Sequence, residues 1–169
     1  MRPGSDEYAE FYAGYVAKVP ETEILQVLKQ QLTDIVQLWR SIPESSATLV
    51  HAPYSWNIRQ VLDHLLDGER IFGHRLHRIG RGDQTPLPGF DENHYSVASE
   101  EHPAPLADIV EMFEHTRKVN ILFLQNLAPE AWLRTGTASN SRISVRALAW
   151  ILAGHIRHHD EILRRRLGM

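Results

Sequence analysis

Apolar residues recur at steps of three and four along four stretches of this chain, the spacing that places side chains on one face of an α-helix. The stretches span residues 21–39, 55–80, 106–127 and 144–163. Ser55 stands where an N-cap is expected before the second stretch, and Ala128-Pro129 ends the third. No segment of useful length shows the period of two that is typical of a β-strand. The pattern therefore predicts four amphipathic helices.

The connection between the second and third helices is unusually long. Residues 80–104 contain clustered glycine and proline, several acids and little periodicity, so we expect no regular element there. A loop of this length is usually functional or mobile. Upstream of the first helix, a weaker helical spacing relates four aromatic residues that we interpret as covering the core: Tyr8, Phe11, Tyr12 and Tyr15. The fold class predicted is all-α, a four-helix bundle with a long connection between helices two and three, in a single domain over residues 1–169.

Composition and charge exclude several classes of function. The chain is 43% apolar and 23% charged with a net charge of −3, so it lacks the broad positive field that recruits nucleic acid or an anionic membrane. No apolar run reaches the length of a membrane span, and the N-terminal acids and tyrosines do not fit a secretory signal, so we expect a cytoplasmic protein. Because the chain has no cysteine, any thiol chemistry must use a thiol that a ligand brings.

Three histidines stand close together near the end of the fourth helix, in the sequence GHIRHHDEIL. At about 100° per residue, His155 and His159 lie within the apolar face, whereas His158 lies at its margin. Two imidazoles one turn apart on a helix can bind the same metal ion. An apolar stripe seldom accepts two inward imidazoles unless something satisfies their nitrogens. Spacing and phase alone leave open a metal site and a pair of hydrogen-bonded core histidines.

Other polar residues also interrupt the apolar faces. His64 lies at one edge of the apolar face of the second helix and is a third candidate ligand. Arg117 and Asn120 fall on the core line of the third helix, where a guanidinium needs an acid or a polar cavity. One interpretation is a structural ion pair between Arg117 and an acid such as Glu69 or Asp91. The other is that Arg117 anchors an anionic group of a substrate.

Three segments of the chain resemble a known family. The segment WNIRQVLDHLLDGER around His64, with EHTRKVNILFLQNL and the late SVRALAWILAGHIRHHDEIL, is similar to the DinB/YfiT superfamily of four-helix bundles. The resemblance runs from the start of the first helix to the end of the chain. It rests on a histidine in a V-L-x-H-L-x-D-x-E-R frame and on the later H-x-x-H-H.

The resemblance implies a divalent metal, usually zinc or nickel, held by His64, His155 and His159, and it implies homodimers in many members. Many members carry an acid directly after the first late histidine, where this chain has Ile156. A carboxylate that would orient the imidazole is therefore expected to be missing at that position. Asp63 and Asp160 are the candidates to replace it, although helix phase directs Asp160 away from the core. An ion held by three neutral imidazoles keeps a position for water or substrate and retains strong Lewis acidity.

Two functions from different classes follow from these residues and from the resemblance. The first is a metal-dependent enzyme acting on a small molecule, either a transferase that uses a low-molecular-weight thiol such as bacillithiol or mycothiol, or a metal-assisted hydrolase. In that hypothesis Arg117 and Asn120 orient an anionic group, and Asp91 and Glu69 are the candidate acid and base. The second is a stress-associated bundle that binds a metal or a small ligand without catalysis.

Overall fold

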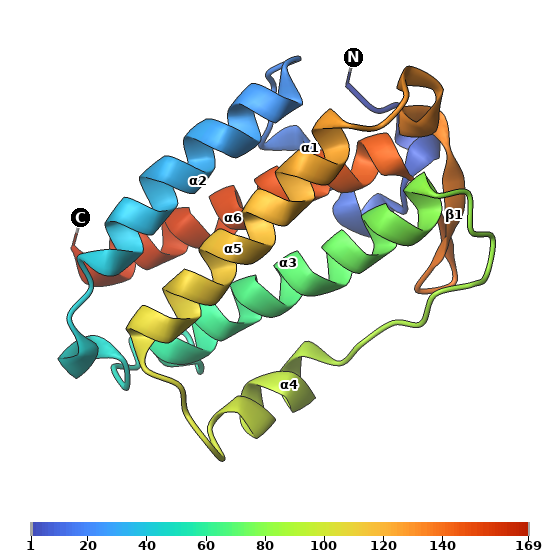
Figure 1. Ribbon diagram of the computed structural model, residues 1–169. Helices are drawn as coiled ribbons and strands as arrows, with labels where there is room; N and C mark the ends of the chain where they lie inside the picture. Colours follow the sequence, from blue (N-terminus) through green and yellow to red (C-terminus); the bar gives the residue numbers. More distant parts are fainter. Residues whose placement is uncertain (1, 169) are drawn as a thin grey trace.

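The structure, a computed structural model, describes residues 2–168, and four long helices dominate it (Figure 1). The long helices are α2 (Ile24–Arg40), α3 (Ile58–Gly80), α5 (Leu106–Gln125) and α6 (Val145–Leu167). The shorter elements are α1 (Ala13–Ala17), α4 (Glu92–Ser99), β1 (Thr135–Ala138), β2 (Ser141–Ser144) and the 3-10 turns Ser5–Glu7, Glu10–Tyr12, Glu44–Ser46 and Pro129–Leu133. None of the helices described is both long and apolar enough to cross a membrane.

The four predicted helices are confirmed, and their boundaries follow local capping chemistry. The helix α3 begins two residues later than expected, because Asn57 and not Ser55 is its N-cap: the Asn57 side chain accepts a hydrogen bond from the Gln60 backbone N–H, and the Gln60 side chain bonds back to Asn57. Ser144 caps α6 by accepting from the Ala147 backbone N–H. The helix α6 ends at Gly168, whose φ of 70° is the left-handed conformation of a helix C-cap.

Two regular elements lie where the sequence pattern predicts none. Residues 80–104 contain the helix α4, which begins where the Asp91 carboxylate accepts hydrogen bonds from the backbone N–H groups of Asn93 and His94. The strands β1 and β2 form an antiparallel hairpin of four residues each, closed by Ser139 and Asn140. Elements this short span too few periods for a hydrophobic pattern to reveal them.

The apolar core consists of two clusters along the length of the bundle. One contains Leu76 and Trp150 and extends to Ile143 of the hairpin. The other contains Leu62 and Phe113. Most members of both clusters come from the faces of α2, α3, α5 and α6 that carry the three- and four-residue spacing, as the amphipathic pattern predicts.

A polar layer separates the two apolar clusters. The Arg117 guanidinium of α5 donates to the Glu69 carboxylate of α3 at 2.7 Å and to the Gln31 side-chain oxygen of α2 at 2.9 Å. The Asn120 amide donates to the other Glu69 oxygen at 2.6 Å. On α6, His155 stands at the same level, between residues of the two clusters. The middle of the bundle is therefore polar, and the histidines lie beside it.

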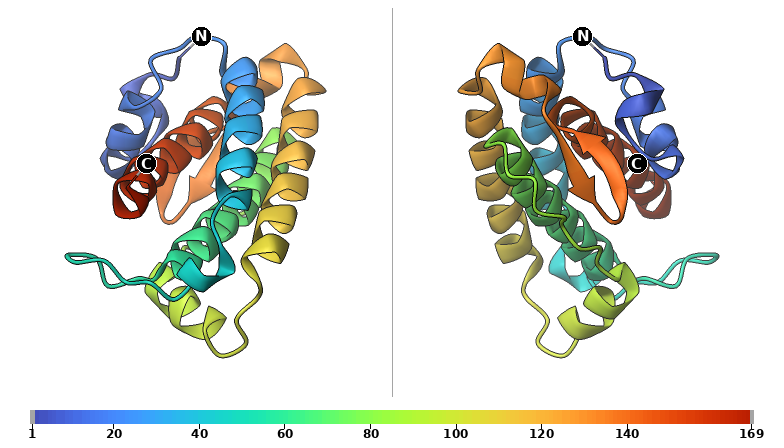
Figure 2. Two further views of the ribbon diagram at one scale, coloured as in Figure 1. Left: turned by 90° about the vertical axis from the view of Figure 1, so that its left-hand side faces the viewer. Right: turned by 90° about the vertical axis from the view of Figure 1, so that its right-hand side faces the viewer.

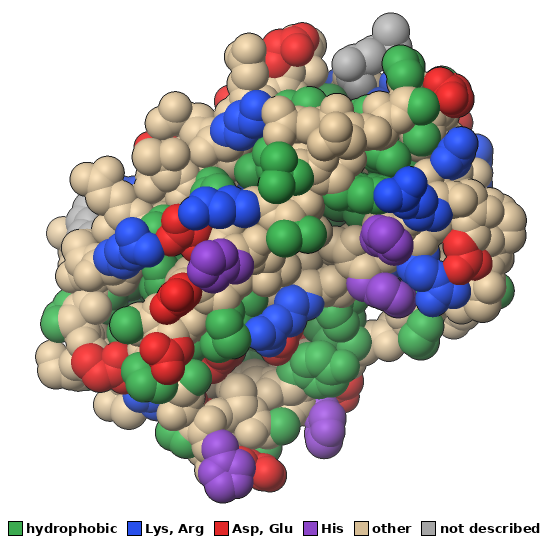
Figure 3. Space-filling model, in the orientation of Figure 1, with side chains coloured by type: hydrophobic (Ala, Val, Ile, Leu, Met, Phe, Trp, Pro, Cys, Tyr) green, Lys and Arg blue, Asp and Glu red, His purple; other side chains and the backbone are tan. Residues whose placement is uncertain are grey.

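Smaller segments complete the bundle around α6. The N-terminal turns and α1 pack along the outer side of α6, and the hairpin lies beside the C-terminal end of α3 (Figure 2). The helix α4 packs against α3. On the face seen in Figure 3, acidic and basic side chains are interspersed with apolar ones, so no large field of one sign covers it.

Candidate metal centre

The side chains of His64, His155 and His159 converge between α3 and α6. The Nε2 atoms of His64 and His155 are 3.0 Å apart, and one ring nitrogen from each of the three residues lies within 4.8 Å of the others. An ion with metal–nitrogen bonds of about 2.0–2.1 Å requires nitrogen atoms about 3.3 Å apart in a tetrahedral shell. The three imidazoles therefore fit one divalent ion after shifts of a fraction of an ångström to about 1.5 Å.

Close packing of α3 on α6 brings the histidines together. Gly68, one turn after His64, faces His155, and a Cβ atom at that position would lie 2.9 Å from the His155 Cε1 atom. The lack of a side chain at Gly68 lets the imidazole approach the backbone of α3. His159 follows one turn after His155 on α6, and its ring centroid lies 4.9 Å from that of His64.

The environment keeps these imidazoles neutral. Burial lowers the pKa of His155 well below its ordinary value of 6.5, and the neighbouring imidazoles of His159 and His64 lower it further. Burial, again with its imidazole neighbours, lowers the pKa of His159 to about 3. Burial also lowers the pKa of His64, although the nearby Glu92 carboxylate opposes that shift. Neutral imidazole is the form that ligates a metal, so the site is ready for an ion without loss of protons.

A cavity of about 310 Å³ opens beside the histidines. Its size is at the lower end of the range for small-molecule sites. Its walls come from the N-terminal turns and α1, from α3 and α6, from the start of α4 and from the hairpin, and they consist of Ala9, Phe11, Tyr12, Tyr15, His64, Phe72, Phe90, Glu92, Ala138, Ser139, Ser141 and His155. The cavity is therefore largely aromatic, with an imidazole wall and a few polar groups.

Three of the other residues singled out from the sequence form a closed network. Arg117 and Asn120 each donate to the Glu69 carboxylate, and the Arg117 and Glu69 side chains are 0% and 1% exposed. This is the ion pair with Glu69 that was one of the two interpretations of Arg117. None of the three lines the cavity beside the histidines. The arrangement adds no support for Arg117 as a substrate anchor or for Glu69 as an acid or base, because neither residue lines the cavity and the Glu69 carboxylate already accepts from Arg117 and Asn120.

Asp91 and Ile156 both have roles in the fold and not in the cavity wall. Asp91 caps α4 and does not line the cavity; its neighbour Glu92 does. Ile156 is 1% exposed and packs in the second apolar cluster. Within residues 2–168 no carboxylate is hydrogen-bonded to His64, His155 or His159.

Several cavity residues were not found from the sequence. Tyr12 and Tyr15 were interpreted as covering the core, and both also line the cavity. The Tyr15 ring meets His155 edge-on, with 5.3 Å between centroids. Glu92 lies in the long connection of residues 80–104, and Ser139 lies in the hairpin turn. Neither segment shows an apolar period that would draw attention to it. The aromatic spacing upstream of the first helix was the one available signal.

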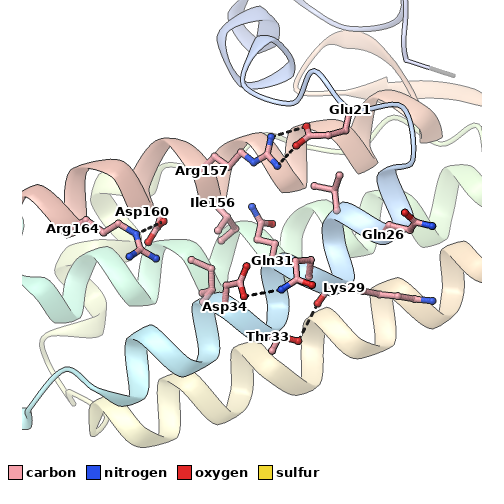
Figure 4. A pocket seen from close by; sticks show the side chains of 13 residues that line it. Glu21, Gln26, Lys29, Gln31, Thr33, Asp34, Ile156, Arg157, Asp160 and Arg164 are labelled. Carbon is pink, nitrogen blue, oxygen red and sulfur yellow. Dashed lines mark hydrogen bonds and ion pairs between the residues drawn. The ribbon is translucent and has the colours of Figure 1, made fainter. Parts of the chain in front are cut away.

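A second hollow lies between α2 and α6, and Figure 4 shows the side chains that line it. It is larger, about 760 Å³, and four of its charged side chains form two ion pairs. Arg157 donates two hydrogen bonds to the Glu21 carboxylate, and Arg164 donates to Asp160. None of the three converging imidazoles lines this groove.

The fold and this geometry define a class: helical bundles in which histidines from two helices converge beside a small-molecule cavity. The chain belongs to the DinB superfamily, whose family model matches residues 28–163. Among curated proteins none matches the chain.

Solved structures share the fold at low sequence identity. YfiT from Bacillus subtilis, described as a probable metal-dependent hydrolase with an unusual four-helix bundle topology, is 18% identical, with a TM-score of 0.75 over 99% of this chain and 94% of that one. A mycothiol-dependent maleylpyruvate isomerase is 12% identical, with a TM-score of 0.70 over 85% of this chain. The match covers 60% of the isomerase, so this chain corresponds to only part of it.

Proposed function

We propose that this protein is a metal-dependent enzyme that acts on a small molecule, with His64, His155 and His159 as the ligands of one divalent ion. The observation that carries the proposal is the convergence of three neutral imidazoles, two of which, His64 and His155, line a cavity of about 310 Å³. When bound there, a divalent ion supplies Lewis acidity that lowers the pKa of a water or a thiol in its open position.

Two reaction classes fit this proposal: transfer by a low-molecular-weight thiol, and metal-assisted hydrolysis. The mycothiol dependence of one structural neighbour supports the former, and the description of YfiT as a metal-dependent hydrolase supports the latter. The absence of cysteine is consistent with a thiol that arrives as a cosubstrate. Zinc or nickel as the ion, a homodimer and a cytoplasmic location belong to the same proposal.

The cavity residues have distinct roles in this proposal. Burial raises the pKa of the Tyr15 phenol, and the nearby Tyr12 and Glu92 raise it further, so Tyr15 stays protonated and can donate a hydrogen bond. Glu92, on the cavity wall near His64, is placed to accept a proton from a reacting group. Phe72 and the neighbouring rings exclude water from the face of the imidazoles.

Metal analysis of protein purified without an affinity tag tests the ligand set. We expect stoichiometric metal in the wild type and loss of it in His155→Ala. The matched control is His158→Ala, which removes a neighbouring imidazole of the same helix that is outside the converging group and should leave the metal content unchanged. Equal metal content in all three proteins would show that His155 is not a ligand of the ion.

A turnover assay separates the enzyme from the non-catalytic alternative. The metal-replete protein is incubated with bacillithiol or mycothiol plus an electrophile, and separately with esters and amides. We expect turnover with one of these two sets, abolished in His155→Ala and retained in His158→Ala. A metal-replete protein with no metal-dependent turnover in either set would favour a bundle that binds metal without catalysis.

A further inference from the structure

One of the two fully buried arginines has no carboxylate partner. Arg75 of α3 is only 1% exposed. Within residues 2–168 no carboxylate oxygen lies within 4.0 Å of the Arg75 guanidinium. The other fully buried arginine, Arg117, is paired with Glu69. A buried charge without a counter-ion is costly, so it is retained only where neutral acceptors or a ligand compensate it.

Neutral groups from three separate segments surround the Arg75 guanidinium. Its Nη2 atom donates to the Pro88 carbonyl oxygen at 3.0 Å and to the Ser139 hydroxyl at 2.8 Å. Its Nη1 atom donates to the Tyr12 hydroxyl at 3.4 Å. The guanidinium also lies 5.6 Å from the centre of the Phe72 ring. None of these groups neutralises the positive charge.

Two of the acceptors face the cavity that contains the histidines. Tyr12 and Ser139 both line it. A hydroxyl has one proton to donate, and a hydroxyl that accepts from a guanidinium directs that proton elsewhere. Within residues 2–168 neither hydroxyl donates to a protein acceptor. Two hydroxyl donors, each bonded to a buried cation, are thus left for an acceptor in the cavity.

The position of Ser139 is set by the backbone. Ser139 and Asn140 have φ values of 50° and 60°, the left-handed pair that a tight two-residue hairpin turn requires. The backbone of Leu87 bonds to the hairpin twice: the Leu87 N–H donates to the Thr137 carbonyl, and the Leu87 carbonyl accepts from the Ser139 N–H. The turn is therefore anchored to the loop that carries Pro88, which fixes the backbone of Ser139 beside Arg75.

We propose that Arg75, Tyr12 and Ser139 form a recognition site for a carboxylate group of the substrate or of the thiol cosubstrate. The proposal rests on the function proposed above, in which the reaction takes place at the histidines. Tyr12 and Ser139 donate to the carboxylate, and Arg75 is a positioning residue that orients both hydroxyls and supplies the positive charge behind them.

The spacing along α3 bounds the shape of the molecule. Arg75 follows His64 by 11 residues, which places both on nearly the same face, with their Cα atoms about 16 Å apart along the helix. The Phe72 ring lies between the two groups, with its centre 5.9 Å from that of His155 and 5.6 Å from the Arg75 guanidinium, so the guanidinium lies closer to His155 than that. The substrate or cosubstrate is therefore an elongated molecule with its reacting group at one end and a carboxylate at the other.

The test compares a carboxylate probe with its neutral isostere. Isothermal titration of 4-phenylbutyrate and 4-phenylbutyramide into the metal-replete protein should show tighter binding of the carboxylate by about 100-fold, because two charge-assisted hydrogen bonds contribute about tenfold each. Tyr12→Phe and Ser139→Ala should each reduce that preference by about tenfold without changing the affinity for the amide. Ser141→Ala, which removes a hydroxyl of the same cavity that does not contact Arg75, is the matched control and should keep the preference.

The outcomes distinguish this proposal from the metal centre. Equal affinity for the two probes in the wild type, or an unchanged preference in both hydroxyl variants, would show that Arg75 only holds three segments together. A preference that persists in His155→Ala would support the carboxylate site even if that protein and the wild type bind no metal. Once turnover is found, the reactant whose KM rises in Ser139→Ala at unchanged kcat is the one that carries the carboxylate; a fall in kcat alone would contradict a recognition role.

Discussion

At the scale of single residues, burial gives charged groups very different surroundings. The pair of Arg117 and Glu69 is fully enclosed and shares its remaining bonds with Asn120 and Gln31. Removing one member of such a pair leaves the other buried without compensation. The Arg40–Glu114 pair lies on the surface, with Arg40 60% exposed, and contributes little. Burial, more than the number of ion pairs, decides which charges matter for stability.

Glu7 shows how one carboxylate fastens the N-terminal segment to the bundle. It is 8% exposed and accepts hydrogen bonds from Ser144, the N-cap of α6, and from Arg146. Burial alone raises the Glu7 pKa, but the hydrogen bonds from Arg146, the Gly4 backbone N–H and Ser144 outweigh it and lower the pKa below its ordinary value of 4.5. The charged form is therefore favoured in the folded state.

Glu7→Gln should lower the free energy of unfolding at neutral pH by about 1–3 kcal/mol, because the variant loses the charge-assisted bonds. A carboxyl whose pKa is lower in the folded state stabilises the protein above its unfolded pKa, and this stabilisation is lost as the pH falls through the folded pKa. The gap between wild type and variant, measured by urea unfolding, should be full above about pH 5 and should close below pH 4.5. A gap that stays constant down to pH 3 would contradict this account.

At the scale of elements, close contacts between helices depend on small residues at defined positions. A Cβ atom at Gly154 of α6 would lie 2.0 Å from the Tyr15 carbonyl oxygen, a backbone atom of α1. Gly154 therefore allows α1 to lie directly on α6 next to His155. This contact positions Tyr15, and with it one wall of the cavity.

Gly154→Ala should push α1 away from α6 and destabilise the fold by about 1–3 kcal/mol, the usual cost of an overpacked contact. The control is Gly14→Ala in α1, where an added Cβ atom meets nothing within 4 Å. That substitution should be neutral or stabilising by up to about 1 kcal/mol, because alanine favours helix more than glycine does. Thermal unfolding of both variants measures the difference, and equal effects would mean that α1 does not rest on Gly154.

The sequence pattern predicted the elements in which the apolar spacing repeats over many turns, and it missed the short elements. The helices α2, α3, α5 and α6 each repeat their apolar spacing over four or more turns, which makes the pattern unambiguous. The helix α4 has eight residues and each strand has four. These short elements form because the Asp91 cap and the turn at Ser139 and Asn140 set local geometry, which a period analysis does not register.

At the scale of the whole molecule, the proposed ion would join α3 to α6 and so contribute to global stability. Three imidazoles held close together without an ion gain little from one another, whereas an ion that binds the folded state stabilises it by mass action. The separation of the core into two apolar clusters by a polar layer makes this link important, since the layer adds less apolar burial than a continuous core would.

Removing the metal with a chelator should lower the melting temperature, and adding metal back at about 100 times its Kd should restore about 2.7 kcal/mol of stability. His159→Gln should lose this dependence, while His158→Ala should keep it, because only His159 belongs to the converging group. Calorimetry with and without added metal measures the shift. A melting temperature that does not respond to metal in the wild type would contradict the proposed ligand set.

The amino-acid sequence by itself determined the four long helices, their inward faces and the inward direction of His155 and His159, because helical periodicity is a local property of the chain. Only the tertiary structure decided which partners distant residues have. Arg117 pairs with Glu69, Arg75 meets Ser139 from 64 positions away, and Tyr12 lines the same cavity as His64. Such contacts depend on how helices and loops pack, and no spacing along the chain encodes that packing.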